Sequence, residues 1–103
     1  MTFLERRSNP RYGFQGEVEI AWGSSQLRAM VSDISKGGMF VVAANPLWVG
    51  ATFSARVLLD TPLEVDCVVR RVLPGRGMGI QFIKVASEAQ GRLDKVVEML
   101  ANP

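Results

Sequence analysis

The sequence contains no histidine and only one cysteine, Cys67. Without an imidazole, the Ser/His/Asp triad, the Cys/His pair and the usual proton shuttle are excluded. A structural zinc site would lack its ordinary nitrogen and sulfur ligands, and a lone cysteine cannot form an internal disulfide. We therefore predict no metal site, no catalytic residues and no enzymatic activity, and we expect the protein to work in a reducing cytoplasm.

Long apolar runs are also lacking. Charged residues or glycines interrupt every apolar stretch well before the roughly 20 residues that a membrane-spanning helix requires, and the chain does not open like a signal peptide. At 103 residues with 48% hydrophobic content, the chain has the size of one domain with its own core. We expect a single domain that does not insert into a membrane.

Carboxylates occur in two pairs, Glu17 with Glu19 and Glu64 with Asp66. Each pair has a spacing of i, i+2, which places both members on one face of a strand. Exposed polar positions that alternate with buried apolar ones produce this pattern on an outer sheet face. We predict solvated surface pairs and find no support for a two-carboxylate hydrolase.

Five stretches alternate apolar and polar side chains with a period of two, and a sixth, residues 39–42, is a β-rich apolar run. Together they predict β-strands separated by turns. In the fifth stretch the alternation breaks at residues 69–72, where a bulge or strong twist would restore the register. Six antiparallel strands with short turns predict a barrel or a closed sandwich. The stretches are residues 17–22, 27–32, 39–42, 53–59, 63–72 and 78–82.

The last segment changes period and predicts an amphipathic helix of about 15 residues. Ser87, with Gln90 three residues later, has the form of a capping box. Gly91 weakens the helix by up to ~1 kcal/mol relative to alanine, so packing on the barrel or on a partner should supply most of its stability. The apolar positions of the helix are Leu93, Val96, Val97 and Leu100.

Three arginines, Arg6, Arg7 and Arg11, lie within six residues of one another near the start of the chain. Guanidinium groups this close repel unless an anion joins them. The planar arginine fork suits both phosphate oxygens and the O6/N7 edge of guanine. A guanine dinucleotide would satisfy both preferences.

A second polar stretch, residues 33–38, contains Asp33, Ser35, Gly37 and Gly38. A carboxylate can accept hydrogen bonds from guanine N1–H and N2–H, and a hydroxyl can contact phosphate or base. Gly38 would allow a close backbone approach or a positive φ. We include all four in the candidate ligand-binding set, although short polar residues before glycines also form ordinary turns.

Together, Arg7-x-x-x-Arg11 and Asp33-x-Ser35-x-x-Gly38 resemble the paired RxxxR and (D/N)xSxxG signatures of PilZ domains, in the same order along the chain. The resemblance implies a receptor for the bacterial second messenger cyclic di-GMP. In such a receptor, the arm with Arg7 and Arg11 wraps over the ligand. Asp33, Ser35 and Gly38 then supply contacts from the barrel.

The resemblance covers the whole chain and includes the last strand, residues 77–82. It implies a basic N-terminal arm, residues 1–15, followed by a six-stranded antiparallel β-barrel with a C-terminal α-helix, residues 16–103. Ordering of the arm by the ligand would pass the signal to an unidentified effector protein. We expect a monomer or a weak dimer.

Two further expectations concern ligand contacts beyond the signatures. In similar domains, a basic residue at the position of Arg6 accompanies a stacked, self-intercalated pair of cyclic di-GMP molecules, so we expect two ligand molecules per domain. Arg70 or Arg71 would contact a guanine, but adjacent strand residues face opposite ways and only one could do so. We take Arg70 as the candidate.

Two alternatives remain. One is a PilZ-fold adaptor that acts by protein contact without nucleotide, through the apolar stripe of the helix or a surface that contains Met30 and Leu58. The other is a small barrel that binds single-stranded nucleic acid. The net charge of only +2 and the 8% aromatic content argue against nucleic acid.

Overall fold

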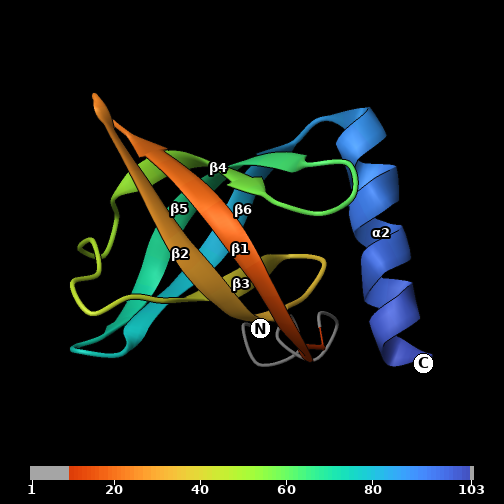
Figure 1. Cartoon of the computed structure of the whole chain (residues 1–103), viewed down its shortest axis with the longest axis horizontal. Coiled ribbons are helices and arrows are strands. Elements are labelled where there is room, and N and C mark those ends of the chain that lie inside the picture. Colours follow the sequence, from red (N-terminus) through yellow and green to blue (C-terminus); the bar gives the residue numbers. More distant parts are fainter. Residues whose placement is uncertain (1–9, 103) are drawn as a thin grey trace, which may run out of the picture.

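The computed structural model describes residues 10–102, in which six antiparallel strands form a closed barrel with a helix beside it (Figure 1). The order around the barrel is β1-β2-β3-β6-β5-β4. This confirms the predicted six-stranded barrel with a C-terminal helix. The elements are β1 (Tyr12–Trp22), β2 (Ser25–Ile34), β3 (Gly38–Val42), β4 (Thr52–Val57), β5 (Leu63–Leu73), β6 (Gly77–Val85) and α2 (Ser87–Ala101).

Strands β1, β2 and β6 extend several residues beyond the predicted stretches, whereas β4 ends at Val57, two residues before the predicted end. Strand β1 begins at Tyr12, so residues 12–15, which the sequence analysis placed in the arm, belong to the barrel. A register shift between Gly13 and Gly16 hides the period of two there. Strand β2 continues to Ile34, which places Asp33 in a strand rather than in the turn that follows.

The irregularity predicted for the fifth strand is confirmed. Val69 lies opposite Ile80 of β6, and Arg71 lies opposite the next residue, Gly79. Arg70 is therefore the extra residue of a bulge in β5. Bulges bend the strand and increase its twist, which a closed barrel of six strands requires somewhere along its long strands.

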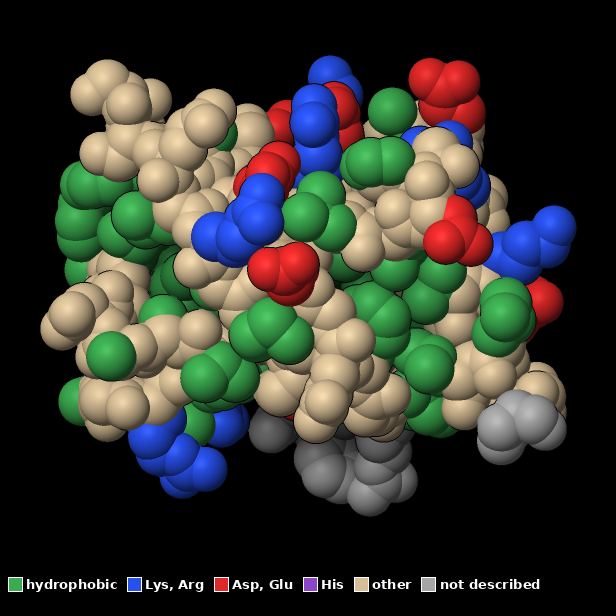
Figure 2. Space-filling view, viewed as in Figure 1, with side chains coloured by type: hydrophobic (Ala, Val, Ile, Leu, Met, Phe, Trp, Pro, Cys, Tyr) green, Lys and Arg blue, Asp and Glu red, His purple; other side chains and the backbone are tan. Residues whose placement is uncertain are grey.

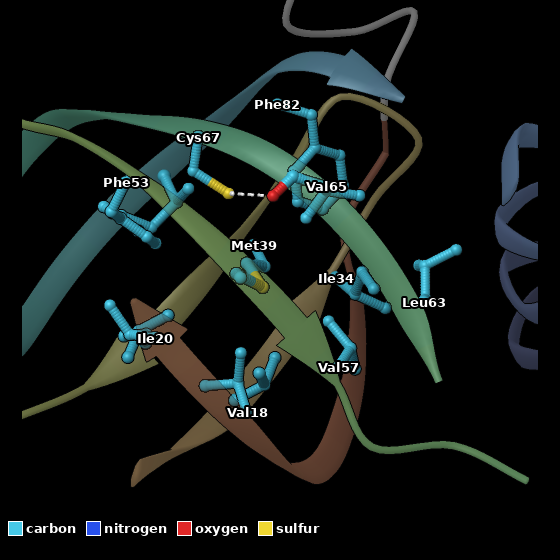
Figure 3. Packing of buried hydrophobic residues seen from close by; sticks show 14 of the residues in the cluster. Val18, Ile20, Ile34, Met39, Phe53, Val57, Leu63, Val65, Cys67 and Phe82 are labelled. Atoms are coloured by element: carbon cyan, nitrogen blue, oxygen red, sulfur yellow. Dashed lines mark hydrogen bonds between the residues drawn. The ribbon is translucent and has the colours of Figure 1, made fainter. Parts of the chain in front are cut away.

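The barrel interior is filled by the apolar members of each alternating strand. Figure 3 shows these side chains converging from all sides, with Met39 of β3 near the centre. Burial, and then the negative charge of Asp66, raise the pKa of the Cys67 thiol to about 12, so this thiol stays protonated at neutral pH. Completely buried core residues include Val18, Ile34, Met39, Val41, Val57, Leu63, Cys67 and Val69.

Helix α2 packs against β1 and β5. Its buried residues are Ala89, Leu93 and Val97, so most of the apolar stripe covers the protein's own barrel. The alternative in which this stripe forms a partner interface is therefore wrong for its central residues. Within residues 10–102, the helix is not long and apolar enough to span a bilayer.

The predicted capping box is wrong. The N-cap residue is Ala86, whose side chain cannot accept a hydrogen bond, and Ser87 is already helical. Gln90 does not reach back toward the cap: its Nε2 donates to Asp94 Oδ1, one turn further on, at 3.0 Å. The helix begins where the chain leaves β6, because the barrel fixes its entry point.

Truncation of the helix stripe tests this packing. Leu93→Ala should lower the free energy of unfolding by about 2–5 kcal/mol, because it removes a fully buried side chain and leaves a cavity. Met99→Ala, at a position 68% exposed on the same helix, should change it by less than about 0.5 kcal/mol. Urea unfolding monitored by circular dichroism measures both. Equal effects would contradict the packing.

Candidate functional site

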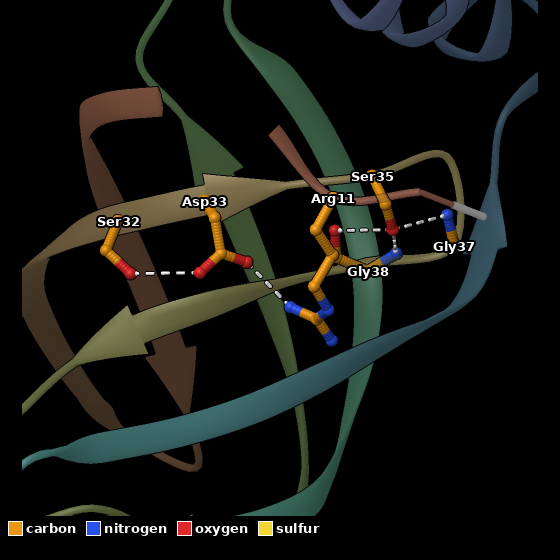
Figure 4. A network of polar contacts seen from close by, with 6 residues as sticks. All are labelled: Arg11, Ser32, Asp33, Ser35, Gly37 and Gly38. Carbon is orange, nitrogen blue, oxygen red and sulfur yellow. Dashed lines mark hydrogen bonds and ion pairs between the residues drawn. The ribbon is translucent and has the colours of Figure 1, made fainter. Parts of the chain in front are cut away.

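The two sequence signatures meet where β1 and β2 pair. Gly13 of β1 lies opposite Asp33 of β2, which brings Arg11, just before β1, to the same place. Arg11 Nη1 lies 2.7 Å from Asp33 Oδ1 (Figure 4). The side chains are 51% and 31% exposed, so this ion pair faces solvent. Ser32 Oγ donates to the second carboxylate oxygen, Oδ2, at 3.3 Å.

Ser35 lies in the turn between β2 and β3 and is only 3% exposed. Its Oγ accepts hydrogen bonds from the backbone N–H groups of Gly37, at 3.2 Å, and Gly38, at 3.1 Å. Its own N–H donates to the Gly38 carbonyl at 2.8 Å. The hydroxyl therefore holds the turn in this structure, the structural role that short polar side chains commonly take.

Gly38 is required by a close backbone approach, one of the two reasons expected for it. A Cβ at this position would lie 2.0 Å from the carbonyl oxygen of Ile80 in β6. The other reason does not apply, since Gly38 is not among the glycines with positive φ. Gly37 also serves the sheet, because its carbonyl accepts the N–H of Phe82 at 2.8 Å. Gly38 therefore lets β3 pair closely with β6, and the Gly37 carbonyl adds one more hydrogen bond to β6.

Arg70 and Arg71 are both exposed, which corrects the expectation that only one of them could face outward. Adjacent residues alternate faces in a regular strand, but Arg70 is the extra residue of the bulge and the rule fails there. Arg70 Nε donates to Gln81 Oε1 of β6 at 2.5 Å. Sequence reasoning located the bulge but missed its consequence for Arg71, and it missed Gln81.

Two of the predicted ligand-binding residues, Arg6 and Arg7, lie outside the described residues. The others fall into two groups. Arg11, Asp33, Ser35, Gly37 and Gly38 come together around the β2–β3 turn. Arg70 lies on β5, which is separated from β2 by strands β3 and β6.

The arginines of the barrel differ in their pairing. Arg28 donates to Glu19 at 2.9 Å and Arg56 to Glu64 at 3.2 Å, on the outer face of β2, β1, β4 and β5. Within residues 10–102, no carboxylate oxygen lies within 4.0 Å of the charged nitrogens of Arg70, Arg71 or Arg76. Figure 2 shows positive side chains gathered at the lower left, where Figure 1 places the turn between β5 and β6.

A hollow of about 540 Å³ lies over the paired charges. Glu64 and Asp66 line it together with Glu19, and Ser54 Oγ donates to Asp66 Oδ1 at 3.2 Å. These carboxylates have hydrogen-bond partners on an exposed surface, which confirms the prediction of solvated outer pairs. Of the signature residues that the structure describes, none lines the hollow.

The chemistry around Asp33 is that of recognition. Asp33 presents an acceptor pair, and Arg11 presents a donor fork beside it, so a ligand with a donor edge and an anionic group could bind both. In the described part of the chain, no cluster of three or more Cys, Asp or Glu side chains is arranged to hold a metal ion.

A family model for the PilZ domain matches residues 5–99. The chain therefore belongs to the PilZ domain family. A comparison with curated protein sequences finds no match.

Several solved structures share the fold. The Bacillus subtilis inhibitor of motility MotI/DgrA has a TM-score of 0.81 and 24% sequence identity. The match covers 91% of this chain but only 50% of that protein. The PilZ domain of YcgR from Escherichia coli, solved with c-di-GMP, has a TM-score of 0.74 and 21% identity, covering 93% of this chain and 92% of that one. The K. pneumonia MrkH–c-di-GMP complex has a TM-score of 0.78 and 21% sequence identity. That match covers 93% of this chain and 52% of MrkH.

A pair of glycine substitutions tests the role of Gly38 in the barrel. Gly38→Ala should lower the free energy of unfolding by about 1–3 kcal/mol, because the new methyl group meets a backbone carbonyl that cannot move without breaking the sheet. Gly79→Ala is the matched control. Its Cβ meets no atom closer than Arg71 Cβ at 3.5 Å, so the change should be below about 0.5 kcal/mol. Thermal unfolding compares them, and a neutral Gly38→Ala would contradict the close approach.

Proposed function

We propose that this domain is a receptor for cyclic di-GMP and not an enzyme. The observation that carries the proposal is the exposed pair of Arg11 and Asp33, one from each signature, with their charged groups 2.7 Å apart. Membership of the PilZ family supports the proposal, as do the structural relatives solved with c-di-GMP.

The ligand would replace the partners that Arg11 and Asp33 have in the free domain. Asp33 would accept from guanine N1–H and N2–H, and Arg11 would turn its fork toward a phosphate. An exposed ion pair contributes about 0–1 kcal/mol, so giving it up costs little. Arg7 would join Arg11 on the ligand. Ser35, Gly37 and Gly38 would hold the turn that presents Asp33.

Arg6 adds a third positive charge to the arm. Positive charges near one another favour a ligand with more negative charge, so three guanidinium groups favour a more anionic ligand than two would. We therefore propose two stacked cyclic di-GMP molecules per domain. Arg70 would contact a guanine from the barrel side.

Isothermal titration of the whole chain with cyclic di-GMP tests the receptor function. Arg7→Ala, Arg11→Ala and Asp33→Ala should each weaken binding about tenfold or more, because each removes a charged hydrogen-bond partner of the ligand. The midpoint ratio gives the number of ligand molecules per domain.

Arg28→Ala is the matched control, since it removes an exposed β2 arginine that pairs with Glu19 away from the site. It should bind like the unmodified protein, and GTP should not compete. Absence of binding by the unmodified protein well above micromolar ligand would overturn the receptor function.

The ligand would also act as a switch on the arm. Residues 5–11 carry three arginines and one glutamate. If these residues closed over an anionic ligand, the negative charge of the ligand would offset the repulsion between the arginines. An arm ordered in this way would change the surface that an effector protein reads. We propose that the domain works in the bacterial cytoplasm as a monomer or weak dimer with such a partner.

Hydrogen exchange of the free and ligand-bound domain tests the switch. The amides before β1 should exchange more slowly with cyclic di-GMP, because the closed arm would shield them from solvent. The β1–β2 hairpin turn at residues 23–24 provides the internal control and should not change. Identical exchange of the arm in both states would contradict the switch while leaving ligand binding intact.

A nucleotide-independent adaptor is the second candidate. Met30 of β2 lies opposite Val42 of β3, and both side chains are exposed apolar groups. Such neighbours can form the centre of a protein contact. An unmodified chain that binds no cyclic di-GMP would favour this function.

A further inference from the structure

We propose that Arg70 and Arg71, with Gln81 as the positioning residue for Arg70, form an outer subsite that recognises a guanine base of the ligand. This inference rests on the proposed function. It adds to the signature residues a second recognition point on β5 and β6, on the other side of β3 from Asp33.

The register of the sheet places this subsite on the same face as Asp33. Asp33 lies opposite Phe40, Phe40 opposite Gly79, and Gly79 opposite Arg71. Directly opposite residues in antiparallel strands project to the same side of the sheet. Asp33 and Arg71 are therefore three strand spacings apart along the outer surface, about 14 Å.

A cyclic dinucleotide carries two guanines, and Asp33 accounts for the hydrogen-bonding edge of only one. The second base needs another recognition point within the span of the ligand. On this face the half-buried Phe40 lies between Asp33 and Gly79. Gly79 adds no side chain next to Arg71, and the long arginine side chains of the bulge shorten the distance to be bridged. The arginines of the β5 bulge are therefore placed to contact the second guanine of the ligand.

Gln81 determines which atoms Arg70 can offer. Because Nε of Arg70 donates to Gln81 Oε1, the two terminal Nη groups can donate a pair of parallel hydrogen bonds to a ligand, in an end-on fork. That fork matches the O6 and N7 acceptors of guanine. A neutral partner also leaves the full positive charge of Arg70 in place, whereas a carboxylate would neutralise it.

Arg71 has a different role in the subsite. Its Cβ lies beside Gly79, and within residues 10–102 its guanidinium has no carboxylate within 4.0 Å. A guanidinium without a counter-ion attracts an anion without regard to the base attached to it. We assign base recognition to Arg70 and attraction of the phosphates to Arg71.

Titrations with cyclic di-GMP and cyclic di-AMP separate these roles. Adenine carries an amino donor where guanine carries O6, so an arginine fork favours guanine. Arg70→Ala should weaken cyclic di-GMP binding about tenfold and lower the preference for cyclic di-GMP over cyclic di-AMP by a similar factor. Gln81→Met, which removes the acceptor but keeps the size, should lower the same preference by a smaller factor. Arg71→Ala should weaken both ligands equally.

Arg76→Ala is the matched control, because it removes an exposed, carboxylate-free arginine from the neighbouring β5–β6 turn. It should leave affinity and preference unchanged, and thermal unfolding verifies that every variant is folded. Unchanged binding by Arg70→Ala, or an equal loss in Arg76→Ala, would overturn the subsite while the receptor function stands. Failure of the unmodified chain to bind would overturn both.

Discussion

Closure of the sheet is the constraint on which the other features of the barrel depend. Strand β1 pairs with β2 on one side and with β4 on the other, so no strand of the barrel is an edge strand. One set of alternate side chains must then fill a small interior, and the other set forms the outer surface. Function is left to the outer set. The bulge in β5 belongs to the same constraint, since it bends a long strand around the barrel and turns two arginines outward together.

The second signature serves the barrel first. Ser35 satisfies the backbone of its turn, and Gly38 lets β3 pair closely with β6. Of this signature, Asp33 is the residue with a partly exposed charged group. Loss of binding after substitution of Ser35 or Gly38 would therefore reflect the shape of the site, whereas loss after substitution of Asp33 would reflect its contact with the ligand. The two kinds of residue need different controls.

Much of the barrel could be predicted because alternation is a local property: Val18 and Ile20 indicate an inward face from their spacing alone. The break at residues 69–72 likewise indicated the bulge. The contact between Arg70 and Gln81 could not be predicted, since it depends on the register between β5 and β6, which no short stretch of sequence encodes. The capping box failed for a related reason, because the barrel determines where the chain enters α2 whatever the side chains at its start prefer.

The two parts of the outer face differ in how their charge is compensated. Arg11 already has a counter-ion in Asp33, so a ligand there exchanges one set of charged hydrogen bonds for another and gains only the difference. Arg70 and Arg71 have no carboxylate partner within residues 10–102, and a ligand there adds contacts without breaking an ion pair. A ligand can shift a conformational equilibrium only by the difference in its affinity for the two states. In the proposed receptor, the exchange at Asp33 would therefore couple binding to the arm, whereas the bulge arginines would contribute mainly to affinity and base preference.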